Sequence, residues 1–228
     1  DANQTYGHMS AIGNELVAGL IAERLSQPME PPGLSATAFD FQAVPGEGGN
    51  LLSRTMAANV QMTNVTAAVS GQAGPLSTEL SMRIQATGVE GEHYGAFSWQ
   101  TDSAGLMTFS LYVQRQTRAG IRLQLLDIES NGVIVDFDYE TGLFDLTKVG
   151  NASRVAFVAE PTGRDDWLRL SVTAELLASS GTTMIQLATA DRRTVFADPT
   201  IEALVQAPMV ERGGVASDFC RPGACSAP

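Results

Sequence analysis

The sequence is poor in the residues that most often bind nucleic acid or carry chemistry. Its 228 residues include two cysteines, two histidines and a single lysine, Lys148, and the formal net charge is −11. An acidic chain without a cluster of Lys and Arg cannot neutralise many phosphates, which argues against nucleic acid and anionic membrane surfaces as partners. No apolar run approaches the ~18–20 residues of a transmembrane helix. A neutral glycan or a protein partner fits this charge balance better.

The familiar catalytic motifs are also missing from the sequence. It contains no Gly-x-Ser-x-Gly elbow, no metalloprotease helix motif and no phosphate-binding loop. A glycoside hydrolase needs two carboxylates across a cleft, and several acidic pairs would meet that requirement by chance. A jelly-roll polysaccharide lyase would need a Tyr or His base beside Arg or Lys, and His93 and Tyr94 with Arg83 would allow this. We therefore expect a protein that is not an enzyme.

The two cysteines lie close together in Cys220-Arg-Pro-Gly-Ala-Cys225. The central Pro-Gly predicts a turn, and outside the cytoplasm we expect the pair to close as a disulfide; two unlinked thiols are the alternative. Zinc would need further ligands, and neither His8 nor His93 is near in sequence. The start at Asp1, without a signal peptide or an initiator Met, leads us to expect a processed protein or a piece of a longer one.

What the sequence does contain is a series of short segments in which apolar and polar residues alternate. Alternation of this kind, broken by Gly- and Asn-bearing turns, is typical of antiparallel strands with one face on a core. We expect strands at 61–69, 79–87, 91–99, 106–114, 121–128, 131–142, 154–159, 166–173, 182–190, 194–197 and 200–207. Roughly ten strands with turns about every 8–12 residues predict an all-β antiparallel jelly-roll sandwich.

Three parts are expected along the chain. In residues 1–33, apolar residues at helical spacing predict a helix over Ser10–Leu25, which the Pro-rich stretch 27–33 ends. This helix either packs on its own domain or docks the chain on another subunit or a larger assembly. Residues 34–210 form the jelly-roll domain, and residues 211–228 form a tail that carries the cysteines.

The alternation also predicts which side chains stand on a free sheet face. With Leu111 and Val113 inward, Tyr112 points outward, and the same logic applies to the other strands. The candidate ligand-binding residues are Arg83, Gln85, Tyr94, Tyr112, Gln114, Arg122, Gln124, Asp136, Asp138 and Arg169. Planar polar side chains hydrogen-bond vicinal sugar hydroxyls, and an aromatic ring packs on the apolar face of a sugar. A plainly solvated sheet face with cross-strand Arg–Asp pairs is the alternative.

No cofactor and no metal site are predicted. The weaker alternative is a structural calcium ion, which prefers hard oxygen ligands such as Asp127, Asp136 and Asp138. The sequence has no Asp-x-Asp-x-Asp-Gly loop, and Asp136 and Asp138 are simply alternate positions of one expected strand.

Several of these segments recur in the same order in one group of proteins. The segments are Asn50-Leu-Leu-Ser, Leu106-Met-Thr-Phe-Ser-Leu-Tyr-Val, Arg122-Leu-Gln-Leu, Asn131-Gly-Val-Ile-Val-Asp-Phe-Asp-Tyr-Glu-Thr-Gly and Asp166-Trp-Leu-Arg-Leu-Ser-Val-Thr. Residues 50–210 thereby resemble the carbohydrate-binding-module-like jelly rolls of phage structural proteins and bacterial secreted glycan-active proteins. That group has Gly-Trp-Tyr-Arg where this chain has Asp166-Trp-Leu-Arg, and its pattern includes neither the N-terminal helix nor the Cys-bearing tail.

The resemblance implies a non-enzymatic protein on the outer surface of a phage or phage-like particle, such as a head or tail fibre or a decoration protein. The β domain would contact host-surface polysaccharide, and the helix would dock on other virion proteins, so we expect a homo-oligomer. One alternative is a secreted bacterial carbohydrate-binding module attached to a polysaccharide-degrading enzyme. Another is a jelly-roll polysaccharide lyase or hydrolase.

Overall fold

The computed structural model describes residues 50–52, 60–77, 79–114, 119–164 and 166–219. This part of the chain contains fourteen β-strands and no helix. The described residues therefore include no helix that could cross a membrane. The predicted helix over Ser10–Leu25 and the predicted Cys220–Cys225 disulfide lie outside the described residues. The expected domain boundaries after residues 33 and 210 stay predictions.

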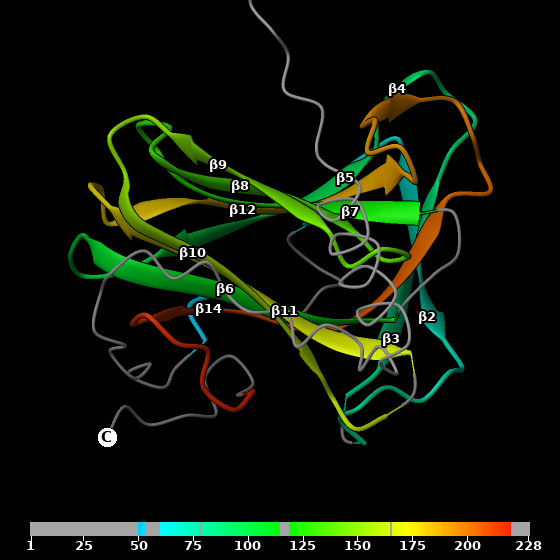
Figure 1. Ribbon diagram of the computed structural model, residues 1–228, viewed down its shortest axis with the longest axis horizontal. Coiled ribbons are helices and arrows are strands. Elements are labelled where there is room, and N and C mark those ends of the chain that lie inside the picture. Colours follow the sequence, from blue (N-terminus) through cyan, green and yellow to red (C-terminus); the bar gives the residue numbers. More distant parts are fainter. Residues whose placement is uncertain (1–49, 53–59, 78, 115–118, 165, 220–228) are drawn as a thin grey trace, which may run out of the picture. The chain divides into compact units, whose positions relative to one another are not determined.

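Two six-stranded sheets make up the body of the domain (Figure 1). The strands of the first sheet are β1 (Val60–Thr63), β5 (Tyr94–Gln100), β7 (Ala119–Asp127), β8 (Gly132–Asp138), β9 (Phe144–Val149) and β12 (Ser180–Thr189). The strands of the second are β2 (Val65–Ser70), β3 (Ser81–Ala86), β6 (Gly105–Gln114), β10 (Ser153–Pro161), β11 (Trp167–Leu176) and β14 (Glu202–Arg212). All their pairings are antiparallel, in the orders β1-β5-β12-β7-β8-β9 and β10-β11-β6-β14-β3-β2. Two short strands, β4 (Gly91–Glu92) and β13 (Val195–Phe196), pair with each other.

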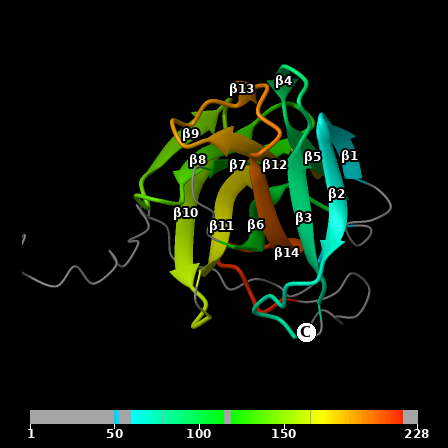
Figure 2. The same ribbon diagram turned by 90° about the vertical axis from the view of Figure 1, so that its right-hand side faces the viewer.

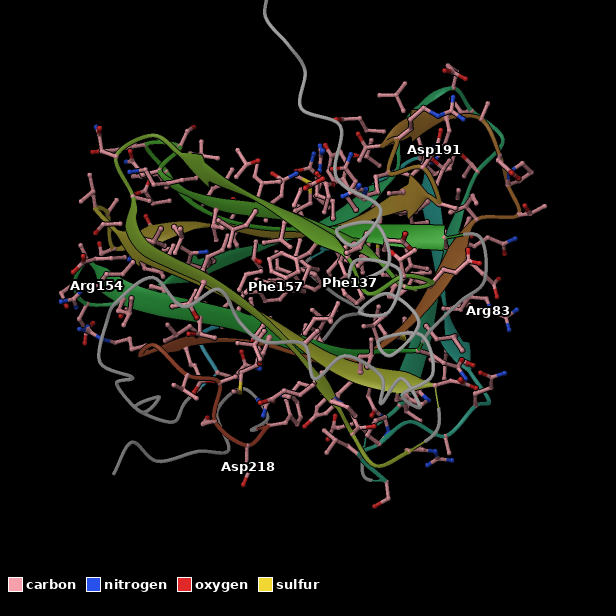
Figure 3. The ribbon with its side chains drawn as sticks, in the orientation of Figure 1. Arg83, Phe137, Arg154, Phe157, Asp191 and Asp218 are labelled. Atoms are coloured by element: carbon pink, nitrogen blue, oxygen red, sulfur yellow. The ribbon has the colours of Figure 1, made fainter. Side chains whose placement is uncertain are left out.

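The two sheets stack with their apolar faces together. On β7, Ile121, Leu123 and Leu125 are completely buried, whereas the side chains between them are half-buried. Phe137 of β8 and Phe157 of β10 meet across the two sheets, with ring centroids 5.6 Å apart (Figure 3). The inward-facing apolar side chains of both sheets therefore form one common core. The predicted all-β antiparallel jelly-roll sandwich is confirmed.

Two of the predicted strands are each divided by a single residue. Asn64, with a φ of 50°, separates β1 from β2, so the chain passes there from one sheet to the other. His93 separates β4 from β5 and is completely buried. Its Nδ1 lies 2.7 Å from the carbonyl oxygen of Asn64, and its Nε2 lies 2.9 Å from that of Phe196. His93 thus ties the β1–β2 corner to β13.

One strand was not predicted, and one predicted strand begins later than expected. β9 carries Phe144 and Leu146 against the core, but Lys148 interrupts the alternation that would have revealed it. In the predicted strand 79–87, the alternation with Met82 and Ile84 would turn Leu80 inward, but Leu80 is 69% exposed because β3 begins only at Ser81.

The β7–β8 hairpin leaves no room for a side chain at Gly132. The residue has a φ of 156°, and a Cβ built on it would lie 1.9 Å from the carbonyl oxygen of Leu125. Both observations require glycine at this position. By contrast, nothing lies within 4 Å of a Cβ built on Gly88, which is exposed.

We predict that Gly132→Ala lowers the free energy of unfolding by about 3 kcal/mol or more, because the backbone or Leu125 must move. Gly88→Ala is the matched control and should stay within about 0.5 kcal/mol of the wild type. Urea unfolding followed by circular dichroism measures both. Equal midpoints for the two variants would contradict the hairpin register described here.

Candidate functional site

The ten predicted site residues are divided between the two outer faces of the sandwich. We name these the β7 face, on the first sheet, and the β6 face, on the second. The β7 face carries Tyr94, Arg122, Gln124, Asp136 and Asp138. The β6 face carries Arg83, Gln85, Tyr112, Gln114 and Arg169. Because the core separates the two faces, the ten residues do not form one site.

Part of the β6 face is covered by residues 213–217, which we call the strap. The hydroxyl of Thr108 donates to the carbonyl oxygen of Gly213 at 2.7 Å. The backbone N–H of Ser217 donates to the buried carboxylate of Glu211 at 2.8 Å, and Arg169 donates to the carbonyl oxygen of Ser217. Burial raises the pKa of Glu211, although the bonds from Ser217 oppose this. The strap therefore occupies polar groups that a ligand on this face would need.

Other polar groups of the β6 face also bind the chain's own backbone or side chains. Gln206 donates to the carbonyl oxygens of Leu76 and Glu79 at 3.0 and 2.7 Å. Gln85 donates to the carbonyl oxygen of Pro199 at 2.9 Å.

Charged side chains of the β6 face also pair within the face. The guanidinium of Arg169 lies over the ring of Tyr112, 5.5 Å from its centroid. Arg83 pairs with Glu202 at 3.6 Å. Little of this face is free to recognise a ligand.

The β7 face has a row of polar side chains across five neighbouring strands. The registers pair Tyr94 with Gln186, Gln186 with Arg122, Arg122 with Asp136 and Asp136 with Asp145. Side chains paired directly across antiparallel strands lie about 4.5–5.5 Å apart at Cβ. These residues therefore form one continuous line of polar side chains on the outer side of the sheet, which we call the polar row.

Two arginines hold the acidic end of the polar row. Arg122 donates to both oxygens of Asp136, from Nε at 2.7 Å and from Nη2 at 2.9 Å. These hydrogen bonds raise the pKa of Arg122 against the opposing effect of its burial. Arg192, in the turn after β12, donates one hydrogen bond from Nη1 to Oδ2 of Asp145. Bidentate pairing fixes the Arg122–Asp136 pair in one orientation.

Gln186 lies in the middle of the polar row and was not predicted. Its side chain is 1% exposed, and its Nε2 has no hydrogen-bond acceptor among the described residues. Its Oε1 accepts from Gln124 at 3.2 Å. The alternation of Ile185, Gln186 and Leu187 in the sequence would have placed it outward, because both neighbours are completely buried.

The polar row has the chemistry of a site for a neutral polyhydroxylated ligand. It offers a half-buried tyrosine ring at Tyr94, a fixed guanidinium–carboxylate pair, and a buried amide N–H at Gln186 that has no acceptor in the described part of the chain. Such planar groups donate to and accept from neighbouring hydroxyls, and a ring packs on their C–H face.

No protein-family model matches the chain, and no curated protein matches it either. Among solved structures, a Bacillus subtilis protein of unknown function with a galectin-like fold has a TM-score of 0.42 at 9% identity, covering 76% of this chain and all of its own. The enzymatically active domain of tailspike protein 4 of bacteriophage CBA120 has a TM-score of 0.36 at 10% identity over 74% of this chain. The match spans 21% of that tailspike chain.

A putative sugar-binding protein from Bacteroides thetaiotaomicron has a TM-score of 0.33 at 10% identity, covering 75% of this chain and 95% of its own. TM-scores below 0.5 at such low identity are too weak to transfer a site or a ligand to this chain.

The three aspartates considered as calcium ligands each accept hydrogen bonds from protein donors. Asp136 binds Arg122, and Asp138 accepts from the hydroxyl and backbone N–H of Thr141. Asp127 is buried and accepts from the backbone N–H groups of Glu129, Asn131, Leu177 and Ala178. A calcium ion would have to displace these donors. Among the described residues, no group of three or more His, Cys, Asp or Glu side chains is arranged to hold a metal.

Asp127 instead joins two turns at one end of the sandwich. Burial alone would raise its pKa, but the bonds from Asn131, Leu177 and Glu129 together hold the pKa below its ordinary value. Its folded-state pKa is thus lower than its unfolded one. The stabilisation is complete above the unfolded pKa of about 4 and is lost as pH falls through the folded pKa.

We predict that Asp127→Asn lowers the free energy of unfolding at pH 7 by about 2–4 kcal/mol, because an amide N–H₂ would face backbone donors. The loss should shrink as the pH falls below about 4. Asp102→Asn, at an exposed position, removes the same charge and should have little effect. Urea unfolding between pH 3 and 7 measures all three proteins, and a loss that does not change with pH would contradict this role of the carboxylate.

Proposed function

We propose that the chain is a non-enzymatic glycan-binding module and that its β7 face is the binding surface. The observation that carries the proposal is the buried Nε2 of Gln186, which has no acceptor among the described residues and lies at the centre of the polar row. A buried donor left unsatisfied costs about 1–3 kcal/mol. A ligand oxygen that accepts from Gln186 removes this penalty. A sugar hydroxyl is such an oxygen, and it reaches the buried Nε2 once the side chains that cover Gln186 move aside.

The side chains beside Gln186 have the chemistry to contact other parts of a bound sugar ring. Tyr94, its partner on β5, presents an aromatic side chain for the C–H face of a pyranose. Arg122 and Asp136, on the other side, are held by two hydrogen bonds and need no rearrangement before they bind hydroxyls. This preorganised pair loses little conformational entropy on binding.

The charges around the polar row favour a neutral glycan. Arg122 is balanced by Asp136 and Arg192 by Asp145. Asp138 adds a further negative charge, because hydrogen bonds from Thr141 and the charge of Arg192 keep its pKa low despite burial. With a chain of net charge −11, an anionic polysaccharide would be repelled.

The module would act outside the cell, on the surface of a phage or phage-like particle, where it contacts host-surface polysaccharide. This part of the proposal extends the resemblance of the strand motifs between residues 50 and 210. Mass spectrometry of purified particles should find the chain in a fixed copy number. Its presence only as a free protein in the culture medium would instead favour a secreted bacterial module.

We predict that Tyr94→Ala and Gln186→Leu each weaken glycan binding about tenfold or more, which corresponds to about 1.4 kcal/mol. Leucine keeps the size of the glutamine and removes only its amide, so the fold should be retained. Tyr112→Ala is the matched control, because Tyr112 lies on the β6 face under Arg169. A glycan-array screen of the full chain, followed by titration calorimetry on the best ligand, measures the three variants.

Loss of binding in Tyr112→Ala, with binding intact in Tyr94→Ala and Gln186→Leu, would place the site on the other face. Binding to uronate-rich polysaccharides in preference to neutral ones would contradict the charge argument. Release of reducing or unsaturated ends from the bound polysaccharide would show an enzyme, contrary to the proposal.

A further inference from the structure

One side of the sandwich is formed by a long stretch of chain without charge. The strands β1 and β2 follow one another from Val60 to Ser70 and are the edge strands of the two sheets on that side (Figure 2). No charged residue occurs between Arg54 and Glu79, although the chain carries 25 acidic and 14 basic residues. This uncharged edge is unusual for so acidic a protein.

Among the described strands, β2 pairs with β3 alone, so its other edge has no strand partner in the described part of the chain. The four residues from Thr66 to Val69 are exposed, and Val69 is 60% exposed. Nearby, Leu80 is 69% exposed at the start of β3. An edge strand with free backbone groups and small or apolar side chains is a template for pairing with another strand.

The edge strands on the opposite side of the sandwich are protected. β9 carries Asp145 and Lys148. β10 carries Arg154 and Glu160, ends at Pro161, and has an irregular register near its start. Charges, proline and irregularities are the devices that keep edge strands from pairing. β9 and β10 have these protective features and β2 lacks them, which indicates that β2 is the edge suited to pairing with another strand.

We propose that β2 is a self-association surface on which a second copy of this chain pairs antiparallel. A two-fold axis at Ala68 sets Ala68 opposite its own copy, with Ala67 opposite Val69 and Thr66 opposite Ser70 of the second copy. The smallest side chains then meet at the axis. Both copies have a charge of −11, so close approach is least opposed at an uncharged edge.

The resulting dimer is two-fold symmetric and closed, because each copy uses the same edge once. A strand pair of five residues from each copy, Thr66 to Ser70, buries less surface than a standard interface, so the dimer is weak, with a dissociation constant in the micromolar range or above. The dimer carries two β7 faces. If these bind glycan as proposed above, the dimer binds a repeating polysaccharide with higher avidity than the monomer does.

Sedimentation velocity of the full chain from about 1 µM to about 1 mM tests the proposal. The wild type should shift from monomer to dimer across this range. Ala68→Glu should raise the dissociation constant at least tenfold, because two introduced carboxylates face each other at the axis. In the monomer the same carboxylate lies opposite Arg83 on β3, so the fold should tolerate it.

Thr147→Glu is the matched control, because it adds the same charge to an exposed position of the edge strand β9. It should dimerise like the wild type. If Ala68→Glu does not fold by circular dichroism, Val69→Glu replaces it. Hydrogen exchange of the backbone amides of residues 65–70 should slow as the wild-type concentration rises.

A wild type that stays monomeric up to about 1 mM overturns the proposal. So does a dimer that survives in Ala68→Glu and Val69→Glu, or one that is equally weakened in Thr147→Glu. Because no glycan is present in these experiments, their outcome is separate from that of the glycan-binding tests.

Discussion

The register of β12 between β5 and β7 is the constraint on which the candidate site depends. It sets Gln186 between Tyr94 and Arg122, and a shift by one residue would turn Gln186 into the core. Close packing holds this register, since a Cβ at Gly181 would lie 2.1 Å from the carbonyl oxygen of Leu126. The polar row on the outside is therefore fixed by the same strand pairing that buries Ile185 and Leu187 on the inside.

The two outer faces differ in how much of their hydrogen-bonding capacity the chain itself uses. On the β6 face, Glu211, Gln206 and Arg169 bind the strap or the backbone near β3. On the β7 face the arginines and carboxylates pair along the sheet, and Gln186 keeps an N–H without an acceptor in the described part of the chain. This difference is the reason for proposing the β7 face as the binding surface.

Alternation in the sequence was enough to predict the fold class, because a strand buried on one face must alternate. It could not predict strand order, so it could not tell that Tyr94 and Tyr112 lie on opposite faces. The covering of Tyr112 and Arg169 depends on contacts with Ser217, far along the chain, which no local pattern reveals. Gln186 could have been predicted from its neighbours, since it follows the same alternation as Arg122.

We propose that the side-chain amide of Gln186 donates to the ligand, and the NMR signal of this amide tests the contact most directly. On titration with a neutral oligosaccharide, we expect the ¹H–¹⁵N signals of the Gln186 side chain to move. Those of Gln206, which already donates to Leu76 and Glu79, should stay in place. Shifts confined to Gln206 and the strap, or no shift at Gln186 with any neutral oligosaccharide that binds, would contradict the account.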